Sequence, residues 1–151
     1  DHNGSRGLGD VYKRQSKILG LDYGKKRCGI SISDELQIIA SPLTTIDTKK
    51  LMDFLKEIIV EESISAIVIG LPKNNRNNIF ELEKTIIDEI KKIKILFPKL
   101  TIHREDERFT SKLSSIYLNQ ITKKRKVKID KKNLDKISAS IILDSYLKKN
   151  K

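Results

Sequence analysis

The chain has 151 residues, and 31 Lys and Arg against 20 Asp and Glu give it a formal net charge of +11. This length fits one domain with a core of its own and excludes two full domains. Hydrophobic residues make up 38% of the chain, which is too much for a disordered polymer. The single Cys28 excludes a disulfide framework and a cysteine-rich zinc site. With no signal peptide and no run of about 18 apolar residues, we expect a cytoplasmic protein without membrane contact.

The basic charge, with a pI near 9.7, favours a polyanionic partner. Lys and Arg that neutralise phosphates gain affinity because they release condensed counterions. The alternative is a lysine-rich surface without a specific role, so the positions of the charges must decide.

Residues 1–17 begin without Met, contain three glycines and show neither helical nor strand periodicity. The segment LGDVYKRQ within them resembles a translated cloning scar. We therefore expect residues 1–17 to be a non-native or disordered extension and residues 18–151 to form a single domain.

The first half of this domain predicts strands and then a helix. Three short β-rich runs start at Ile18, Cys28 and Ile38, and tight turns between them predict an antiparallel meander. The following apolar residues have the spacing of an amphipathic helix, with Asp47 or Thr48 as its N-cap. These apolar residues are Leu51, Phe54, Leu55, Ile58 and Ile59.

The second half alternates strands and helices. We expect a buried strand at 66–70, a helix at 80–97 and a strand at 101–106. A short helix at about 110–120, a basic loop at about 122–132 and a final helix at 133–149 follow. This order predicts an α/β fold with a mixed five-stranded sheet, three antiparallel strands and then two parallel ones, flanked by helices. Such sheets bind ligands at the carboxyl ends of their central strands.

Acidic residues collect at these strand ends. Asp22 lies inside the first strand, where a buried carboxylate needs a cation or hydrogen bonds to compensate it. A metal site would provide this, whereas a turn-capping role before Gly24 is the alternative. Glu105, Asp106 and Glu107 are adjacent at the end of the last strand and repel one another unless a positive charge lies between them or the strand end is solvated. Strand alternation, if it continues, sends Glu105 and Glu107 to one face and Asp106 to the other.

Asp135 opens the expected final helix, where the helix dipole favours a carboxylate. Small residues at 138–140 would let this helix approach the sheet closely and bring Asp135 toward Asp22. Three carboxylates from two strands and a helix can hold two Mg²⁺ or Mn²⁺ ions for the attack of water on a phosphodiester.

Four segments resemble the signature blocks of the YqgF family of pre-16S rRNA nucleases and Holliday-junction-resolvase-like proteins. They are ILGLDYGKKRCGISISD, IVIGLPKNN, EDERFTS and LDKISASIILDSYL, and the resemblance covers residues 18–149. It implies an RNase H-like fold and a metal-dependent endonuclease that matures the 5′ end of 16S rRNA during ribosome biogenesis in the cytoplasm. By motif, it implies Asp22, Glu107 and Asp135 as the catalytic residues and metal ligands, although the residues alone leave Asp106 and Glu107 as alternatives.

Basic residues and one asparagine are the expected contacts to nucleic acid, pre-16S rRNA above all. They are Lys25, Lys26 and Arg27 in the first turn, Lys73, Asn74 and Arg108 in two of the blocks, and Lys123, Lys124, Arg125 and Lys126 in the basic loop. A solvated loop is the alternative for the last group.

Other functions remain open at this stage. A resolvase of branched DNA needs the same acids but also a two-fold dimer, whereas we expect a monomer or a weak homodimer. Leu21-Asp-Tyr-Gly24 also resembles the phosphate loop of actin-like ATPases and sugar kinases, but those enzymes need two such domains. A non-catalytic RNA-binding module is the third alternative. We expect His103 to be a structural or surface residue and Cys28 to be a small core residue.

Overall fold

The computed structural model describes residues 16–72, 79–106 and 131–150. Its elements are β1 (Lys17–Tyr23), β2 (Arg27–Ser33), β3 (Ala40–Asp47), the 3₁₀ turn η1 (Thr48–Lys50), α2 (Leu51–Glu61), β4 (Ile64–Gly70), α3 (Ile79–Leu96), β5 (Thr101–Glu105) and α5 (Lys131–Lys149). The helix expected at about 110–120 and most of the basic loop lie outside the described residues.

The five strands form one mixed sheet in the order β3-β2-β1-β4-β5. The pairs β1–β2 and β2–β3 are antiparallel, whereas β4 runs parallel to β1 and β5 parallel to β4. This confirms the predicted meander followed by two parallel strands. The carboxyl ends of β1, β4 and β5 therefore lie at one edge of the sheet.

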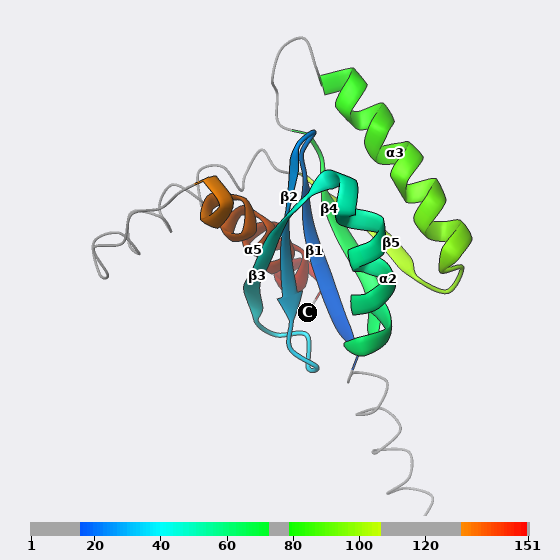
Figure 1. The fold of residues 1–151 in the computed structure, drawn as a ribbon. Helices are drawn as coiled ribbons and strands as arrows, with labels where there is room; N and C mark the ends of the chain where they lie inside the picture. The colour runs from blue at the N-terminus through cyan, green and yellow to red at the C-terminus, as the bar shows by residue number, and fades with distance from the viewer. Residues whose placement is uncertain (1–15, 73–78, 107–130, 151) are drawn as a thin grey trace, which may run out of the picture.

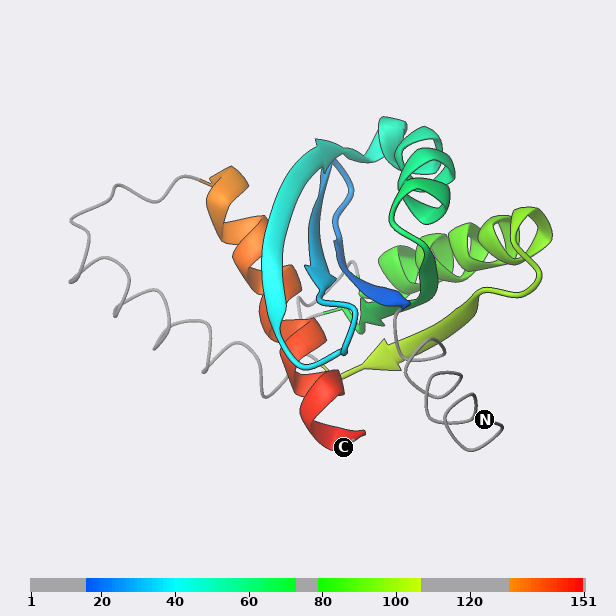
Figure 2. The ribbon, with the colours of Figure 1, turned by 90° about the horizontal axis from the view of Figure 1, so that it is seen from below.

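Helices cover both faces of the sheet, with α5 on one face and α2 and α3 on the other (Figures 1 and 2). The α2 and α3 side holds the larger core, to which these two helices contribute Leu51, Leu55, Ile58, Ile59, Ile86 and Ile93. A smaller core lies under α5 and joins Ile142, Leu143 and Leu147 to Ile18, Ala66 and Val68. No helix within the described ranges is long and apolar enough to cross a membrane.

The start of α2 differs from the prediction. The helix begins at Leu51, after the 3₁₀ turn, and the Asp47 side chain makes no capping hydrogen bond. The Thr48 hydroxyl donates to the Gly24 carbonyl oxygen at 2.7 Å, and the Thr48 N–H donates to the Lys26 carbonyl oxygen at 2.9 Å. Thr48 therefore attaches the 3₁₀ turn to the β1–β2 turn and does not cap α2.

The start of α5 also differs. It begins at Lys131, so Lys131 and Lys132 belong to the helix and not to the basic loop. The first turn of α5 contains no acidic residue, and Asp135 lies after it. The helix dipole acts within about the first turn, so the interpretation of Asp135 as an ordinary N-terminal carboxylate is wrong.

Candidate active site

Asp22 lies on the face of the sheet that α5 covers. Its neighbours Leu21 and Tyr23 are buried in the core beneath α2 and α3. Because successive side chains of a strand point to opposite faces, Asp22 points toward α5. Asp22 is half-buried and pairs across the antiparallel ladder with Gly29 of β2.

Gly29 brings α5 into direct contact with the sheet. A Cβ atom at Gly29 would overlap the carbonyl oxygen of Asp135, so only glycine fits there without a shift of the helix. One helical turn further along α5, the Ser31 hydroxyl donates to the Ala139 carbonyl oxygen at 2.7 Å. This confirms the predicted close approach of α5. Gly29 is at once the cross-strand partner of Asp22 and the packing partner of Asp135.

Arg27 forms an ion pair with Asp135. The distance from Arg27 Nε to Asp135 Oδ2 is 3.1 Å, and the two side chains are 32% and 28% exposed. We expected Arg27, like Lys25 and Lys26, on the nucleic acid. The structure places Lys25 and Lys26 at the exposed tip of the turn and Arg27 against the acid.

The acids at the end of β5 take different positions. Glu105 is buried and accepts hydrogen bonds from Ser145 Oγ at 2.6 Å and Lys149 Nζ at 3.2 Å. These contacts tie it to the C-terminal half of α5. Since β5 ends at Glu105, strand alternation does not extend to Asp106 and Glu107. Asp106 is half-buried, and Glu107 lies outside the described residues together with Lys73, Asn74, Arg108 and Lys123 to Lys126.

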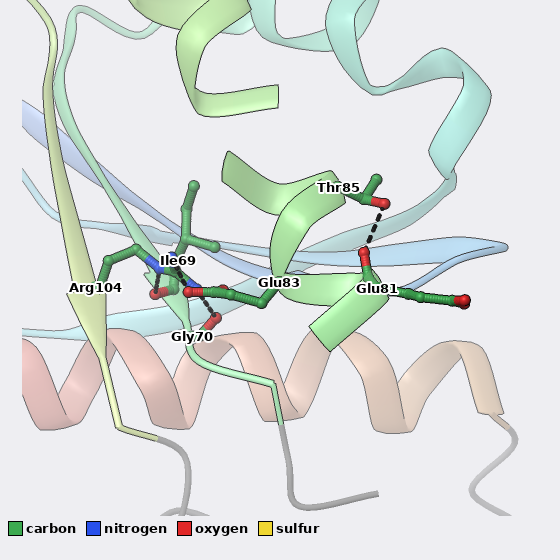
Figure 3. Close-up of polar contacts among 6 residues, drawn as sticks. All are labelled: Ile69, Gly70, Glu81, Glu83, Thr85 and Arg104. Carbon is green, nitrogen blue, oxygen red and sulfur yellow. Dashed lines mark hydrogen bonds and ion pairs between the residues drawn. The ribbon is translucent and has the colours of Figure 1, made fainter. Parts of the chain in front are cut away.

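Arg104 joins β5, the carboxyl end of β4 and α3 (Figure 3). Its guanidinium donates to both carboxylate oxygens of Glu83, at 2.6 and 3.2 Å. It also donates to the carbonyl oxygens of Ile69 and Gly70, both at 3.3 Å. No motif or spacing in the sequence singles out this pair. Arg104 thus fixes the edge of the sheet beside Asp22.

The donor chemistry of the site fits a hard divalent cation. Asp22 and Asp135 supply carboxylate oxygens, the ligands that Mg²⁺ and Mn²⁺ prefer. Softer ligands are absent from this part of the described chain. Cys28 is fully buried in the opposite core, where burial raises the pKa of its thiol, and His103 packs on Tyr146 with ring centroids 4.7 Å apart. No cluster of three acids, histidines or cysteines that could hold a metal ion occurs within the described residues, and Glu107, the third acid expected from the motif, lies outside them.

The chain is similar to a known family and to named bacterial relatives. The family model RuvX, described as "Holliday junction resolvase", matches residues 16–149. A Bacteroides fragilis protein named "Putative pre-16S rRNA nuclease" is 42% identical over 132 residues, which are 87% of this chain and 96% of the relative. A protein of the same name from Karelsulcia muelleri is 45% identical over 138 residues, 88% of this chain and 99% of the relative.

Solved structures show the same fold. The chain resembles Thermus thermophilus RuvC in complex with a Holliday junction substrate, with a TM-score of 0.62 at 12% identity, over 89% of this chain and 95% of that one. It also resembles the yeast mitochondrial Holliday junction resolvase Ydc2, with a TM-score of 0.51 at 10% identity, over 95% of this chain and 84% of that one. At these identities the likeness concerns the fold, which is the expected RNase H-like fold.

Proposed function

This chain belongs to the RuvX (YqgF) family, and from that premise we propose that it is a metal-dependent endonuclease that processes the 5′ end of pre-16S rRNA in the cytoplasm. The observation that carries the proposal is that Gly29 is the cross-strand partner of Asp22 and that the backbone of Asp135 packs on the same glycine. The nuclease relatives and the resolvase-like fold support a hydrolase acting on phosphodiester bonds.

Asp22 and Asp135, with Glu107 as the family's third acid, would hold one or two Mg²⁺ or Mn²⁺ ions. Such an ion supplies a nucleophile from water at neutral pH and offsets the charge that develops on the phosphate. The protein's own part is to fix the ligands. The backbone of Asp22 is set by the β1–β2 ladder and that of Asp135 by the packing of α5 on Gly29, so both residues would be held in place before the substrate arrives.

The nucleic acid would approach over the β1–β2 turn. Lys25 and Lys26 are exposed there, next to the strand that carries Asp22. Lys25 Nζ lies 3.8 Å from a carboxylate oxygen of Glu81, an exposed contact that a phosphate can replace. Lys73, Asn74, Arg108 and the basic loop remain part of the proposed RNA-binding surface.

The test is Mg²⁺-dependent cleavage of a 5′-extended 16S rRNA fragment by the wild type and by Asp22→Asn. We expect the variant to bind the RNA but to lose cleavage, because one ligand charge is gone. Asp144→Asn is the matched control, because Asp144 also lies on α5 but pairs with Lys148 at 2.9 Å, and it should cleave normally. Full cleavage by Asp22→Asn would contradict the proposal.

A four-way DNA junction in the same assay separates the proposed substrate from that of the structural neighbours. Faster cleavage of the rRNA fragment supports the proposal, and faster symmetric cleavage of the junction favours a resolvase. An RNA-binding module without activity would bind the fragment and leave it intact in Mg²⁺ and in Mn²⁺.

A further inference from the structure

Arg27 is placed where it can control the orientation of Asp135. It is the first residue of β2, two positions before Gly29, and its Nε lies 3.1 Å from Asp135 Oδ2. Both side chains are about one-third exposed. An ion pair of this exposure adds little to folding stability, so stability alone gives no strong reason for an arginine here.

The backbone of Asp135 is already fixed by other contacts. Its peptide packs on Gly29, and the next helical turn is held by the hydrogen bond from Ser31 Oγ to the Ala139 carbonyl oxygen. The side-chain torsions of Asp135 are what remains to be set. The contact with Arg27 Nε sets them.

This contact uses one oxygen of the carboxylate. A carboxylate can accept through both of its oxygens, so a bond from Arg27 to Oδ2 is compatible with a cation at Oδ1. The positive charge also offsets the repulsion between Asp135 and Asp22, which lie on the same face of the sheet. Arg27 therefore orients the Asp135 carboxylate in the metal-free protein.

We infer that Arg27 is a positioning residue for Asp135, which it holds by Oδ2 so that the carboxylate is preset for a divalent cation. The inference rests on the proposed function, in which Asp135 is a metal ligand. It gives Arg27 a role different from that of Lys25 and Lys26, whose side chains lie at the exposed tip of the turn.

The experiment measures Mn²⁺ binding to the full chain by isothermal titration calorimetry, without nucleic acid. Arg27→Met should weaken Mn²⁺ binding by about 10- to 100-fold, the usual cost of losing a group that orients a metal ligand. Arg27→Lys should also weaken it, because a flexible ammonium does not reproduce the planar Nε–H donor. Lys49→Met is the control. It removes one exposed positive charge from the 3₁₀ turn attached to the same region and should leave Mn²⁺ affinity unchanged.

Circular dichroism and thermal unfolding in EDTA establish that each variant is folded. In an Asp135→Asn background, Arg27→Met should have no further effect on Mn²⁺ affinity. Unchanged or tighter Mn²⁺ binding by Arg27→Met, with Asp135→Asn clearly weakened, would overturn the inference and leave the metal site standing. Equal binding by wild type and Asp135→Asn would overturn the metal site itself, and with it the role of Arg27.

Discussion

Gly29 is the residue on which the geometry of the site depends. Any side chain there would meet the Asp135 carbonyl oxygen and push α5 away from β2. We expect Gly29→Ala to lower the free energy of unfolding by about 1–3 kcal/mol, the usual cost of inserting atoms into a packed contact. Urea unfolding in EDTA measures this.

The control for Gly29→Ala is Ser41→Ala on the exposed part of β3, which should change the stability by less than about 0.5 kcal/mol. In the folded fraction of Gly29→Ala, Mn²⁺ binding should weaken as well, because Asp135 is displaced. Wild-type stability together with wild-type Mn²⁺ affinity in Gly29→Ala would show that α5 does not need this contact.

Tyr23 gives a pH dependence with a definite sign. Burial is the main cause that raises its pKa from 10.0 to about 12, and the charge of Glu89 adds to the effect. Since the folded state disfavours the phenolate, the stabilisation is complete below pH 10 and is lost as the pH rises from 10 toward 12. Tyr23→Phe has no proton to lose, so its urea midpoint should fall less than that of the wild type between pH 9 and 11. Parallel losses in the two proteins would assign the alkaline instability to other groups.

At the scale of the elements, the hydrogen bonds of Arg104 to Glu83, Ile69 and Gly70 hold β4, β5 and α3 together (Figure 3). Arg104→Met leaves the Glu83 carboxylate without its partner and removes the donor to two carbonyl oxygens at the end of β4. Hydrogen bonds to charged groups contribute about 1.5–3 kcal/mol, and we expect a loss of stability of that size in urea unfolding.

Lys148→Met is the control variant for the loss of stability in Arg104→Met. It breaks an exposed i,i+4 pair with Asp144 and should cost less than about 0.5 kcal/mol. Equal effects of the two substitutions would mean that the Arg104 contacts are no stronger than a surface pair.

The sequence predicted which helices and strands form better than it predicted the residues at which they begin. The spacing from Leu51 to Ile59 is a local signal and identified α2 correctly, and the crossovers gave the parallel pairing of β4 and β5. The start of α2 was missed because Thr48 donates its hydrogen bonds to carbonyl oxygens of the β1–β2 turn, a tertiary contact. The start of α5 at Lys131 was missed because a run of lysines gives no stop or start signal of its own.

The sequence proposes residues for the site but not their contacts. Asp22 and Asp135 were proposed by strand position and by motif, and their role as metal ligands stays a prediction. The partner of Arg27 lies 108 positions away, and no spacing rule connects residues so distant. Gly29 did carry a signal, because a glycine inside a β-rich run marks a bulge or a close backbone approach. Glu105 could not be separated from Asp106 and Glu107 without the contacts to Ser145 and Lys149.

At the scale of the whole molecule, the net charge of +11 raises the question of which basic residues bind nucleic acid and which only keep the protein soluble. The sheet separates the face that carries α5 from the face covered by α2 and α3 (Figure 2). Lysines on the second face, such as Lys56 and Lys91, are exposed but lie across the sheet from Asp22 and Asp135. If the charge serves binding, cations next to the acids should matter more than these.

The basic loop, which contains Lys123 to Lys126 and ends before α5, tests whether the position of the charges matters for binding. Lys and Arg that contact phosphates carry no sequence information through that contact, so the contribution of these cations should be electrostatic. Replacing Lys123, Lys124, Arg125 and Lys126 by Ala should flatten the plot of log K against log salt by about 0.7 for each lost phosphate contact on single-stranded RNA, without changing sequence preference. The matched control replaces four exposed lysines of the α2 and α3 side, Lys56, Lys91, Lys92 and Lys99, by Ala. An unchanged slope in the loop variant would make the loop a solvated connector, and equal flattening in both variants would mean that total charge, and not its position along the chain, governs binding.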